Sequence, residues 1–235
     1  MAELFERIGF LQQGPFAVPR WEALFANMDT LWEGALVTLL VASLGLVLSL
    51  ALGTIIGVMS ASQWKAPRAF ARAYVEFFQN TPLLIQVFMI YNALPILIKG
   101  MFIPVIVIGI IGVGMYHGAY IAEVVRAGIQ SIGRGQLEAA LSQGFSYVGA
   151  MRYIIIPQAM RVVLPPLTNQ AVSLIKNTSV LAVIAGGDLM YAGDSFAGTY
   201  GHYGPTYVVV GLLYFAMCFP LARLARRLES KARVA

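Results

Sequence analysis

Two clusters of polar residues interrupt long apolar stretches of this sequence and carry groups suited to binding a small polar solute. His117, Tyr120 and Glu123 follow one another at three-residue steps, so on a helix they share one face. The second cluster is the tetrapeptide Lys176-Asn177-Thr178-Ser179. A small zwitterionic solute needs an acceptor for its cationic group and a donor for its carboxylate. We expect Glu123 to be that acceptor, and Lys176 or the two hydroxyls that follow it to be the donor.

Structural roles for the same residues stay open beside this binding role. Lys176 could equally pair with Glu123 or with a neighbouring carbonyl, because a buried charge is stabilised by whatever partner lies near it. For His117 we favour a packing role with its hydrogen bonds satisfied inside the protein. Tyr120 is also consistent with an ordinary core position.

Catalytic chemistry is not indicated anywhere in the sequence. The two histidines are far apart, and the one cysteine, Cys218, lies inside an apolar run. Paired catalytic carboxylates, a metal-ligand cluster and the phosphate-binding pattern G-x-x-x-x-G-K-[ST] are all missing. The sequence therefore predicts a chain that is not an enzyme, has no catalytic or metal site, and binds no cofactor itself.

The composition places these polar clusters inside a membrane. Of the 235 residues, 59% are apolar and only 11% are charged. Soluble domains carry about 25% charged residues, and a single core could not hide this much apolar surface from water. The net charge of +5 does not indicate nucleic-acid binding, because the basic residues flank apolar runs, as membrane-orienting residues do.

The hydropathy pattern predicts an all-α integral membrane protein with about five transmembrane helices. Residues 1–30 are mixed and are interpreted as an interfacial or external segment, residues 31–222 as the transmembrane domain, and residues 223–235 as a basic tail. The expected spans cover about 31–59, 74–98, 104–132, 167–184 and 205–221. Residues 133–166 are expected to form short helices in water or at the interface, and residues 186–204 a loop. Gly53 and Gly57 should allow close helix contact.

The basic residues also predict the orientation of the spans. Segments 62–72, 126–161 and 223–235 are rich in Lys and Arg and poor in acids, and all three fall on the same side of a five-span chain. Because cytoplasmic loops carry the excess of Lys and Arg, this side is expected to be the cytoplasm. The N-terminus should then lie outside and the C-terminus inside.

The segment between the third and fourth spans carries a recognisable pattern. It reads Glu138-Ala139-Ala140, then Gly144 after three residues, and Ile154-Ile155-Ile156-Pro157 after nine more. This spacing resembles the EAA loop of ABC importer permeases, with Ile156 in place of the usual leucine. Further blocks resemble the polar amino acid uptake branch of that family: Asn80–Leu84, Gly118–Glu123, Arg126–Ile132, Ile156–Ala159 and Leu174–Ser179.

The resemblance implies a type I ABC importer transmembrane fold in a bacterial plasma membrane. The loop 133–160 would form a coupling helix that docks on a cytoplasmic ATPase dimer, and this ATPase would bind the ATP and Mg. Coupling residues would then be Glu138, Ala139, Ala140, Gly144 and Pro157. From the residues themselves, small alanines allow close helix contact, Gly144 allows a sharp turn, and Pro157 should restart the chain direction at the membrane.

The resemblance also implies a second permease subunit and an external or tethered amino-acid-binding protein. A glutamate, glutamine or aspartate substrate is favoured, since Lys176 and His117 suit an acidic or amide side chain. The alternative is a channel or secondary carrier that works without an ATPase. That alternative gives no reason for a docking loop of this spacing, and the two halves show no inverted repeat.

Overall fold

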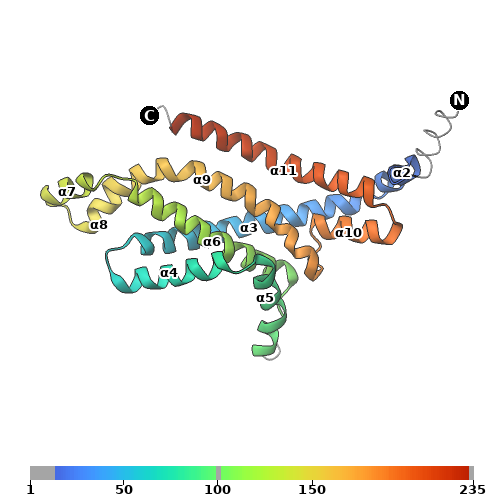
Figure 1. Cartoon of the computed structure of the whole chain (residues 1–235), viewed down its shortest axis with the longest axis horizontal. Helices are drawn as coiled ribbons and strands as arrows, with labels where there is room; N and C mark the ends of the chain where they lie inside the picture. Colours follow the sequence, from blue (N-terminus) through green and yellow to red (C-terminus); the bar gives the residue numbers. More distant parts are fainter. Residues whose placement is uncertain (1–13, 99–101, 233–235) are drawn as a thin grey trace.

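The structure is a computed structural model that describes residues 14–98 and 102–232, and all regular elements in these ranges are helical (Figure 1). The elements are α2 (Val18–Ala26), α3 (Met28–Ala61), α4 (Lys65–Asn80), α5 (Leu83–Leu97), α6 (Val105–Gln130), α7 (Arg134–Ser142), α8 (Tyr147–Ala150), the π-helix η1 (Met151–Ile155), α9 (Ile156–Asn177), the 3₁₀-helix η2 (Thr178–Ile184), α10 (Leu189–Tyr200) and α11 (Tyr203–Ala232). The all-α prediction is confirmed. The amphipathic pattern expected within residues 1–13 lies outside the described residues.

Three helices are long and apolar enough to cross a membrane alone: α3, α6 and the Tyr203–Arg227 part of α11. Two further spans arise if each bent helix pair is counted as one. The first pair is α4 with α5, bent by 101°, and the second is Tyr147–Ile184 with α10, bent by 46°. The expectation of about five spans therefore agrees with the structure, although two of the five are broken.

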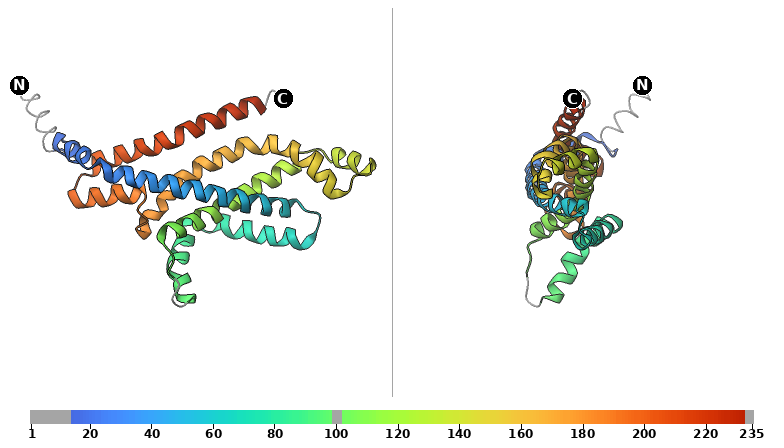
Figure 2. Two further views of the ribbon diagram at one scale, coloured as in Figure 1. Left: turned by 180° about the vertical axis from the view of Figure 1, so that it is seen from behind. Right: turned by 90° about the vertical axis from the view of Figure 1, so that its left-hand side faces the viewer.

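The helices form an elongated bundle with two distinct ends. The helices α2 and α10 and the start of α11 lie at one end, whereas α7, α8 and the turn between α3 and α4 lie at the other (Figures 1 and 2). The C-terminal part of α11 runs toward the α7–α8 end. Helix α5 leaves the long axis of the bundle and projects to the side (Figure 2).

The second expected span, 74–98, is not one straight helix. Helix α4 ends at Asn80 because Thr81 is extended, with φ −111° and ψ 131°, as a residue before proline usually is. The side chain of Gln86 then donates Nε2 to the carbonyls of Phe78 at 3.0 Å and Thr81 at 2.9 Å. These bonds satisfy carbonyls that the broken helix leaves unpaired, so the bend is stable in an apolar environment.

The expected start of the fourth span at residue 167 is wrong, because α9 runs unbroken from Ile156 to Asn177. Pro165 and Pro166 both lie inside this helix. Proline is tolerated there because lipid leaves the backbone few partners other than the helix itself. Pro157 also lies within continuous helical structure, so the chain changes direction at Ser146, the N-cap of α8, and not at Pro157.

The interpretation of residues 186–204 as a loop is also wrong. Helix α10 fills most of this segment, and Asp188 caps it by accepting a hydrogen bond from the Met190 amide at 3.0 Å. Before it, η2 ends at Ala185, whose φ of 54° is left-handed. The tightened helix, the left-handed residue and the capped helix together produce the 46° bend.

The seam between α3 and α6 holds the bundle together and depends on glycine. A β-carbon at Gly57 would lie 2.7 Å from the Ala122 carbonyl oxygen, and one at Gly53 would lie 2.9 Å from the Gly118 oxygen. Both distances are too short for any side chain. The expected close contact at Gly53 and Gly57 is therefore confirmed, and it brings the polar residues of α6 against the backbone of α3.

Candidate functional site: a polar helix junction and an exposed helical hairpin

His117 is the centre of a hydrogen-bonded group between α6 and α9. Its side chain is 1% exposed. Asn177 Nδ2 lies 3.0 Å from Nε2, and Gln170 Oε1 lies 3.2 Å from Nδ1. Because an amide nitrogen can only donate, Nε2 accepts and Nδ1 carries the proton that it donates to Gln170. His117 is thus a neutral, fully satisfied histidine that joins two helices, which agrees with the packing role favoured from the sequence.

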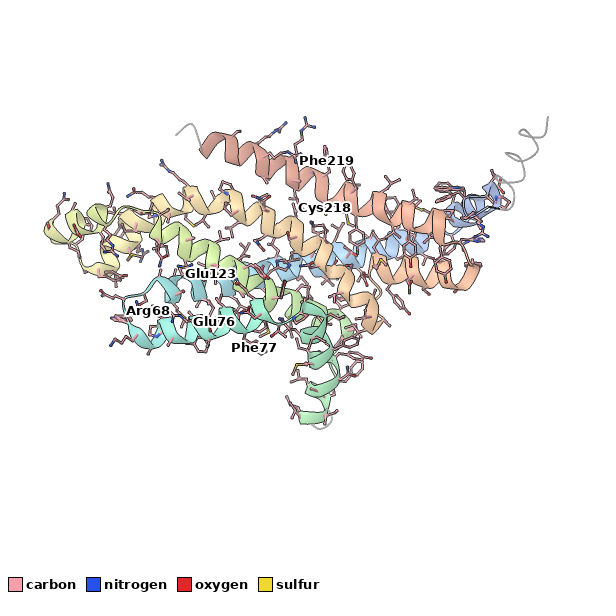
Figure 3. All side chains as sticks on the ribbon, in the orientation of Figure 1. Arg68, Glu76, Phe77, Glu123, Cys218 and Phe219 are labelled. Carbon is pink, nitrogen blue, oxygen red and sulfur yellow. The ribbon has the colours of Figure 1, made fainter. Side chains whose placement is uncertain are left out.

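The other two members of the α6 cluster have partners within α6. The hydroxyls of Tyr120 and Tyr116 lie 3.1 Å apart, and their rings are 5.0 Å apart. Glu123 accepts bonds from Nε and Nη2 of Arg126, the shortest at 2.6 Å, and Arg126 Nη1 also donates to Gln130 at 2.7 Å. Figure 3 shows Glu123 in the middle part of the molecule on the α6 ribbon. The acid expected to receive an ammonium group is therefore already paired with a guanidinium.

The tetrapeptide Lys176–Ser179 lies where α9 tightens into η2. The Thr178 hydroxyl is fully buried and donates to the Ile175 carbonyl at 2.8 Å, and the Ser179 hydroxyl donates to the Lys176 carbonyl at 2.8 Å. Asn177 is held by His117, as described above. Lys176 is exposed on the isolated chain, and within the described ranges no ion pair includes it. The junction thus fixes three side chains and leaves one cation available.

Lys176 lines a cavity of about 340 Å³ that lies between the α9–η2 junction and the helices α10 and α11. The other lining residues are Ser179, Met190, Tyr207, Val210, Gly211 and Tyr214. The volume is in the range of pockets for small ligands. On this largely apolar wall the Ser179 hydroxyl donates to the Lys176 carbonyl, and the Tyr207 hydroxyl donates to Asp194 at 2.7 Å. The Lys176 ammonium group remains as the donor that suits a carboxylate.

A buried acid lies directly behind this cavity. Asp188 is fully buried, and its Oδ1 has no hydrogen-bond partner among the described residues. The Tyr214 hydroxyl is buried close to Asp188, Thr38 and Thr178, but it too has no bond of good geometry there. The Thr38 hydroxyl accepts from the Leu189 amide at 3.0 Å, which ties α3 to the start of α10. Unpaired buried oxygens of this kind mark a strained or functional position.

The expected coupling residues gather in an exposed hairpin at one tip of the bundle. Glu138 and Ala139 are exposed on α7, whereas Ala140 is 2% exposed. Gly144 has φ 85° and donates its amide to the Leu141 carbonyl at 3.0 Å, while the Phe145 amide donates to the Ala140 carbonyl at 3.1 Å. This is a Schellman end, which explains the glycine at this spacing. Pro157 is exposed on α9, beyond the hairpin.

Sequence reasoning missed several residues of this region. Gln170 was not among the predicted residues, and Asn177 was predicted as part of the 176–179 cluster but not as a partner of His117. Both reach His117 across 53 and 60 positions of the chain, so no local pattern reveals these bonds. Asp188 was assigned to a loop, although Asp before an apolar run is an N-cap signal that would have indicated α10. Cys218, labelled on α11 in Figure 3, lies 3.9 Å from the Val172 carbonyl and behaves as a packed apolar residue.

Comparison with known proteins decides the family. The family model described as the binding-protein-dependent transport system inner membrane component matches residues 53–234. The chain belongs to this family. As one of these inner membrane components it is a multi-pass membrane protein of an ABC importer, and in such systems a partner ATPase binds the nucleotide and a binding protein delivers the solute. The predicted ABC permease family and the prediction that the chain is no ATPase are confirmed.

Individual members of the family cover nearly the whole chain. The probable glutamine ABC transporter permease protein GlnM of Bacillus subtilis is 40% identical over 208 residues, which are 88% of this chain and 95% of the relative. The glutamine transport system permease protein GlnP of Escherichia coli is 32% identical over 214 residues, 91% of this chain and 98% of the relative.

Solved structures of inner membrane components share the fold. The crystal structure of an amino acid ABC transporter with histidines matches with a TM-score of 0.81 at 32% identity, over 90% of this chain and 98% of that one. An inward-facing MetNI methionine ABC transporter matches with a TM-score of 0.64 at 18% identity, over 86% and 95%, and this likeness shows the fold alone. The predicted type I importer transmembrane fold is confirmed.

Proposed function

We propose that this permease moves a polar amino acid into the cytoplasm and that glutamine is its favoured substrate. The support is the identity of 40% with a probable glutamine permease, together with a cavity whose one cation suits an α-carboxylate. Glutamate and aspartate are the competitors, as the sequence suggested. A secondary carrier or channel is not favoured, because the exposed hairpin at the bundle tip has no role in either.

The orientation follows the charges. We propose that the α7–α8 end faces the cytoplasm and the α2–α10 end faces outward. In support, the turn between α3 and α4, the hairpin and the late part of α11 lie toward the same end of the bundle (Figure 1), and all three carry the Lys and Arg excess.

Within this frame, Lys176 is the substrate-binding residue that the geometry favours most. It is the cation that lines the cavity between α9 and α11, and it is not held by any acid that the structure describes. Ser179 lines the same cavity, but its hydroxyl already donates to the Lys176 carbonyl, so it can only accept a further hydrogen bond. His117, Tyr120, Asn177 and Thr178 then act as positioning residues that fix the junction, because their polar atoms already have protein partners. Glu123 forms an ion pair with Arg126, so we assign it a structural role and not a role in binding the substrate.

For coupling, we propose that a partner ATPase dimer grips the exposed face of α7 through Glu138 and Ala139. Gly144 sets the end of this helix, and the buried Ala140 sets its distance from the rest of the hairpin. A second permease subunit would complete the membrane assembly, and its most suitable contact is the laterally projecting α5. The exposed apolar side chains of α5, such as Ile96 and Leu97 at 76% and 77%, need such a cover or lipid.

The test is uptake of radiolabelled glutamine by the complex reconstituted in vesicles with its ATPase and binding protein. Lys176→Gln should raise the KM about tenfold or more, because a hydrogen-bonded charge contributes about 1.5–3 kcal/mol. Lys65→Gln, which removes a cation at the α7–α8 end, is the matched control and should leave the KM unchanged. Competition by unlabelled glutamate, aspartate and neutral apolar amino acids ranks the substrates. An unchanged KM in Lys176→Gln removes this residue from the site.

A further inference from the structure

A second cavity, with a more apolar and aromatic lining than the first, lies beside the hairpin formed by α7 and α8, which is called the coupling hairpin below. It encloses about 380 Å³ between the turn that joins α3 to α4 and the segment that leads from α8 through η1 into α9. Its principal lining residues are Val58, Trp64, Tyr147, Val148, Met151 and Arg152. Ser62 and Ile156 complete the lining, and the polar groups on this wall are the two hydroxyls of Ser62 and Tyr147 and the guanidinium of Arg152.

The residues that line this cavity indicate its position relative to the membrane. Val58 belongs to the membrane-spanning helix α3, whereas Trp64 lies three residues beyond the end of α3. Trp64 is 66% exposed and Val148 is 66% exposed, so both side chains are accessible from outside the bundle. Trp and Tyr favour the boundary between hydrocarbon and water. The cavity therefore lies at the end of a span, where acyl chains meet headgroups.

The charged side chains around this cavity, Arg152 and Lys65, are both positive. Arg152 forms no ion pair with any acid in residues 14–98 and 102–232, where the pair of Glu123 with Arg126 is the one salt bridge. The acids on the neighbouring elements are Glu138 on α7 and Glu76 on α4, and both are exposed and unpaired with it. Lys65, which follows Trp64 and starts α4, adds a second cation beside the opening.

The π-helix gives the wall its shape. In η1 the amide of Ile156 bonds to the carbonyl of Met151, five residues earlier, which widens the turn. Met151, Arg152 and Ile156 thereby reach the same cavity as Tyr147 and Val148 one turn before. π-turns are uncommon and concentrate at functional sites.

We propose that this cavity binds an anionic phospholipid, with an acyl chain against Val58 and Met151 and the phosphate on Arg152. Cationic side chains at the cytoplasmic surface attract anionic headgroups, and the apolar wall supplies the chain contact. A docked ATPase is the less suitable occupant, because Val58 on the cavity wall belongs to the membrane-spanning helix α3 and Trp64 lies just beyond the end of that span. The lipid bridges the α3–α4 turn and the coupling hairpin, so it braces the hairpin against the bundle. This inference goes beyond the proposed transport function and does not depend on which amino acid is carried.

The experiment uses Trp64 as the probe. In the complex with its ATPase, Trp21→Phe and Trp32→Phe leave Trp64 as the one tryptophan of this chain, and fluorescence from the ATPase is subtracted with a Trp64→Phe complex. Vesicles contain phosphatidylcholine with either brominated phosphatidylglycerol or brominated phosphatidylcholine. Quenching by the anionic bromolipid should require a lower mole fraction than quenching by the zwitterionic one. Arg152→Gln should reduce this preference about fivefold, the effect of one basic residue at a membrane surface.

Two controls separate the outcomes. Arg152→Lys keeps the charge and should keep the preference, and Arg226→Gln removes an exposed cation on α11 and should leave it unchanged. Equal quenching by the two bromolipids in the parent complex, or an unaltered preference in Arg152→Gln, would overturn the proposal. The absence of quenching by either lipid would also overturn it, because the ATPase would then be the occupant. Failure of glutamine uptake leaves these readings unaffected, so the two proposals fail separately.

Discussion

Asn177, the last residue of α9, donates from its Nδ2 to Nε2 of His117 on α6 across 3.0 Å. This bond fixes the point at which α9 tightens into η2, and the preceding residue, Lys176, extends into the cavity beside α11. The relationship means that a buried neutral histidine determines where an exposed cation lies. Loss of this hydrogen bond should therefore lower both the stability of the permease and its affinity for the substrate.

The first prediction concerns this pair. His117→Ala should lower the free energy of unfolding by about 1–3 kcal/mol, because it removes a buried side chain and leaves the half-buried amides of Asn177 and Gln170 unpaired. Asn177→Leu should lower it by a similar amount, and the double variant by less than the sum, since the same bond is lost. Thermal unfolding of the purified permease in lipid nanodiscs measures all three. Strict additivity would show that the two side chains do not interact.

The second prediction separates Glu123 from the substrate site. Glu123→Gln should change stability by no more than about 1 kcal/mol, because the pair with Arg126 is one-third exposed and joins residues on one helix. The KM for glutamine should stay at the parental value. Uptake assays in vesicles decide this, and a large rise in KM would return Glu123 to the list of ligands.

The third prediction uses the α3–α6 seam. Gly57→Ala should destabilise the permease by about 1–3 kcal/mol, since the new β-carbon would lie 2.7 Å from the Ala122 carbonyl oxygen. Gly198→Ala on α10 is the matched control, because nothing lies within 4 Å of its β-carbon position. We expect the control to be neutral or slightly stabilising by helix propensity. Equal melting temperatures for the two variants would contradict the close approach.

The fourth prediction tests the end of the coupling helix. Gly144→Ala should destabilise the hairpin by about 1–2 kcal/mol, because φ 85° is left-handed and a β-carbon is strained there. Amides of α7 should exchange with deuterium faster, and less ATPase should be captured by the immobilised permease. Gly135→Ala on the same helix has open space around it and an unstrained backbone, so it should do neither. Normal ATPase capture by Gly144→Ala would mean that the hairpin end has no part in docking.

The fifth prediction concerns Tyr214. Tyr214→Phe should leave the free energy of unfolding within about 0.5 kcal/mol of the parent, because the hydroxyl has no well-formed bond to lose. Thr38→Val, by contrast, removes the acceptor of the Leu189 amide and should destabilise by about 1–3 kcal/mol. If the Tyr214 hydroxyl contacts substrate, uptake falls in Tyr214→Phe without loss of stability. A strongly destabilised Tyr214→Phe would show that the hydroxyl has a structural partner.

Local features were predictable from the sequence because their causes are local. Gly144 at its distance from Glu138 predicts the turn that the structure shows, and Gly53 with Gly57 predicts the close seam. The pair of Glu123 with Arg126 follows the i,i+3 rule, but the sequence analysis considered a substrate cation or Lys176 as the partner of Glu123 and did not consider Arg126. The partner that Glu123 takes depends on how α6 and α9 pack, which the sequence alone does not give.

Tertiary causes were not readable in the same way. Pro82 is visible in the sequence, yet the 101° bend that follows it also depends on Gln86 reaching back to Phe78. Pro165 and Pro166 suggested a helix boundary, but an apolar environment keeps the helix intact. The cavity beside Lys176 combines residues of α9, η2, α10 and α11, and no spacing along the chain indicates that combination.

The glycine seam also determines where this molecule can bend. With carbonyl oxygens of α6 lying almost against the α3 backbone, neither helix can slide past the other by one residue without a collision. We therefore expect α3 and α6 to move together as one rigid unit. The substrate passage should then open and close through movement of the helices beside this pair. The two bent helix pairs of the described residues, bent by 101° at Thr81–Pro82 and by 46° near Ala185, are where we expect this movement to occur. Substitutions that rigidify either bend should therefore hold the transporter in one conformation, whereas substitutions that loosen the α3–α6 contact should not.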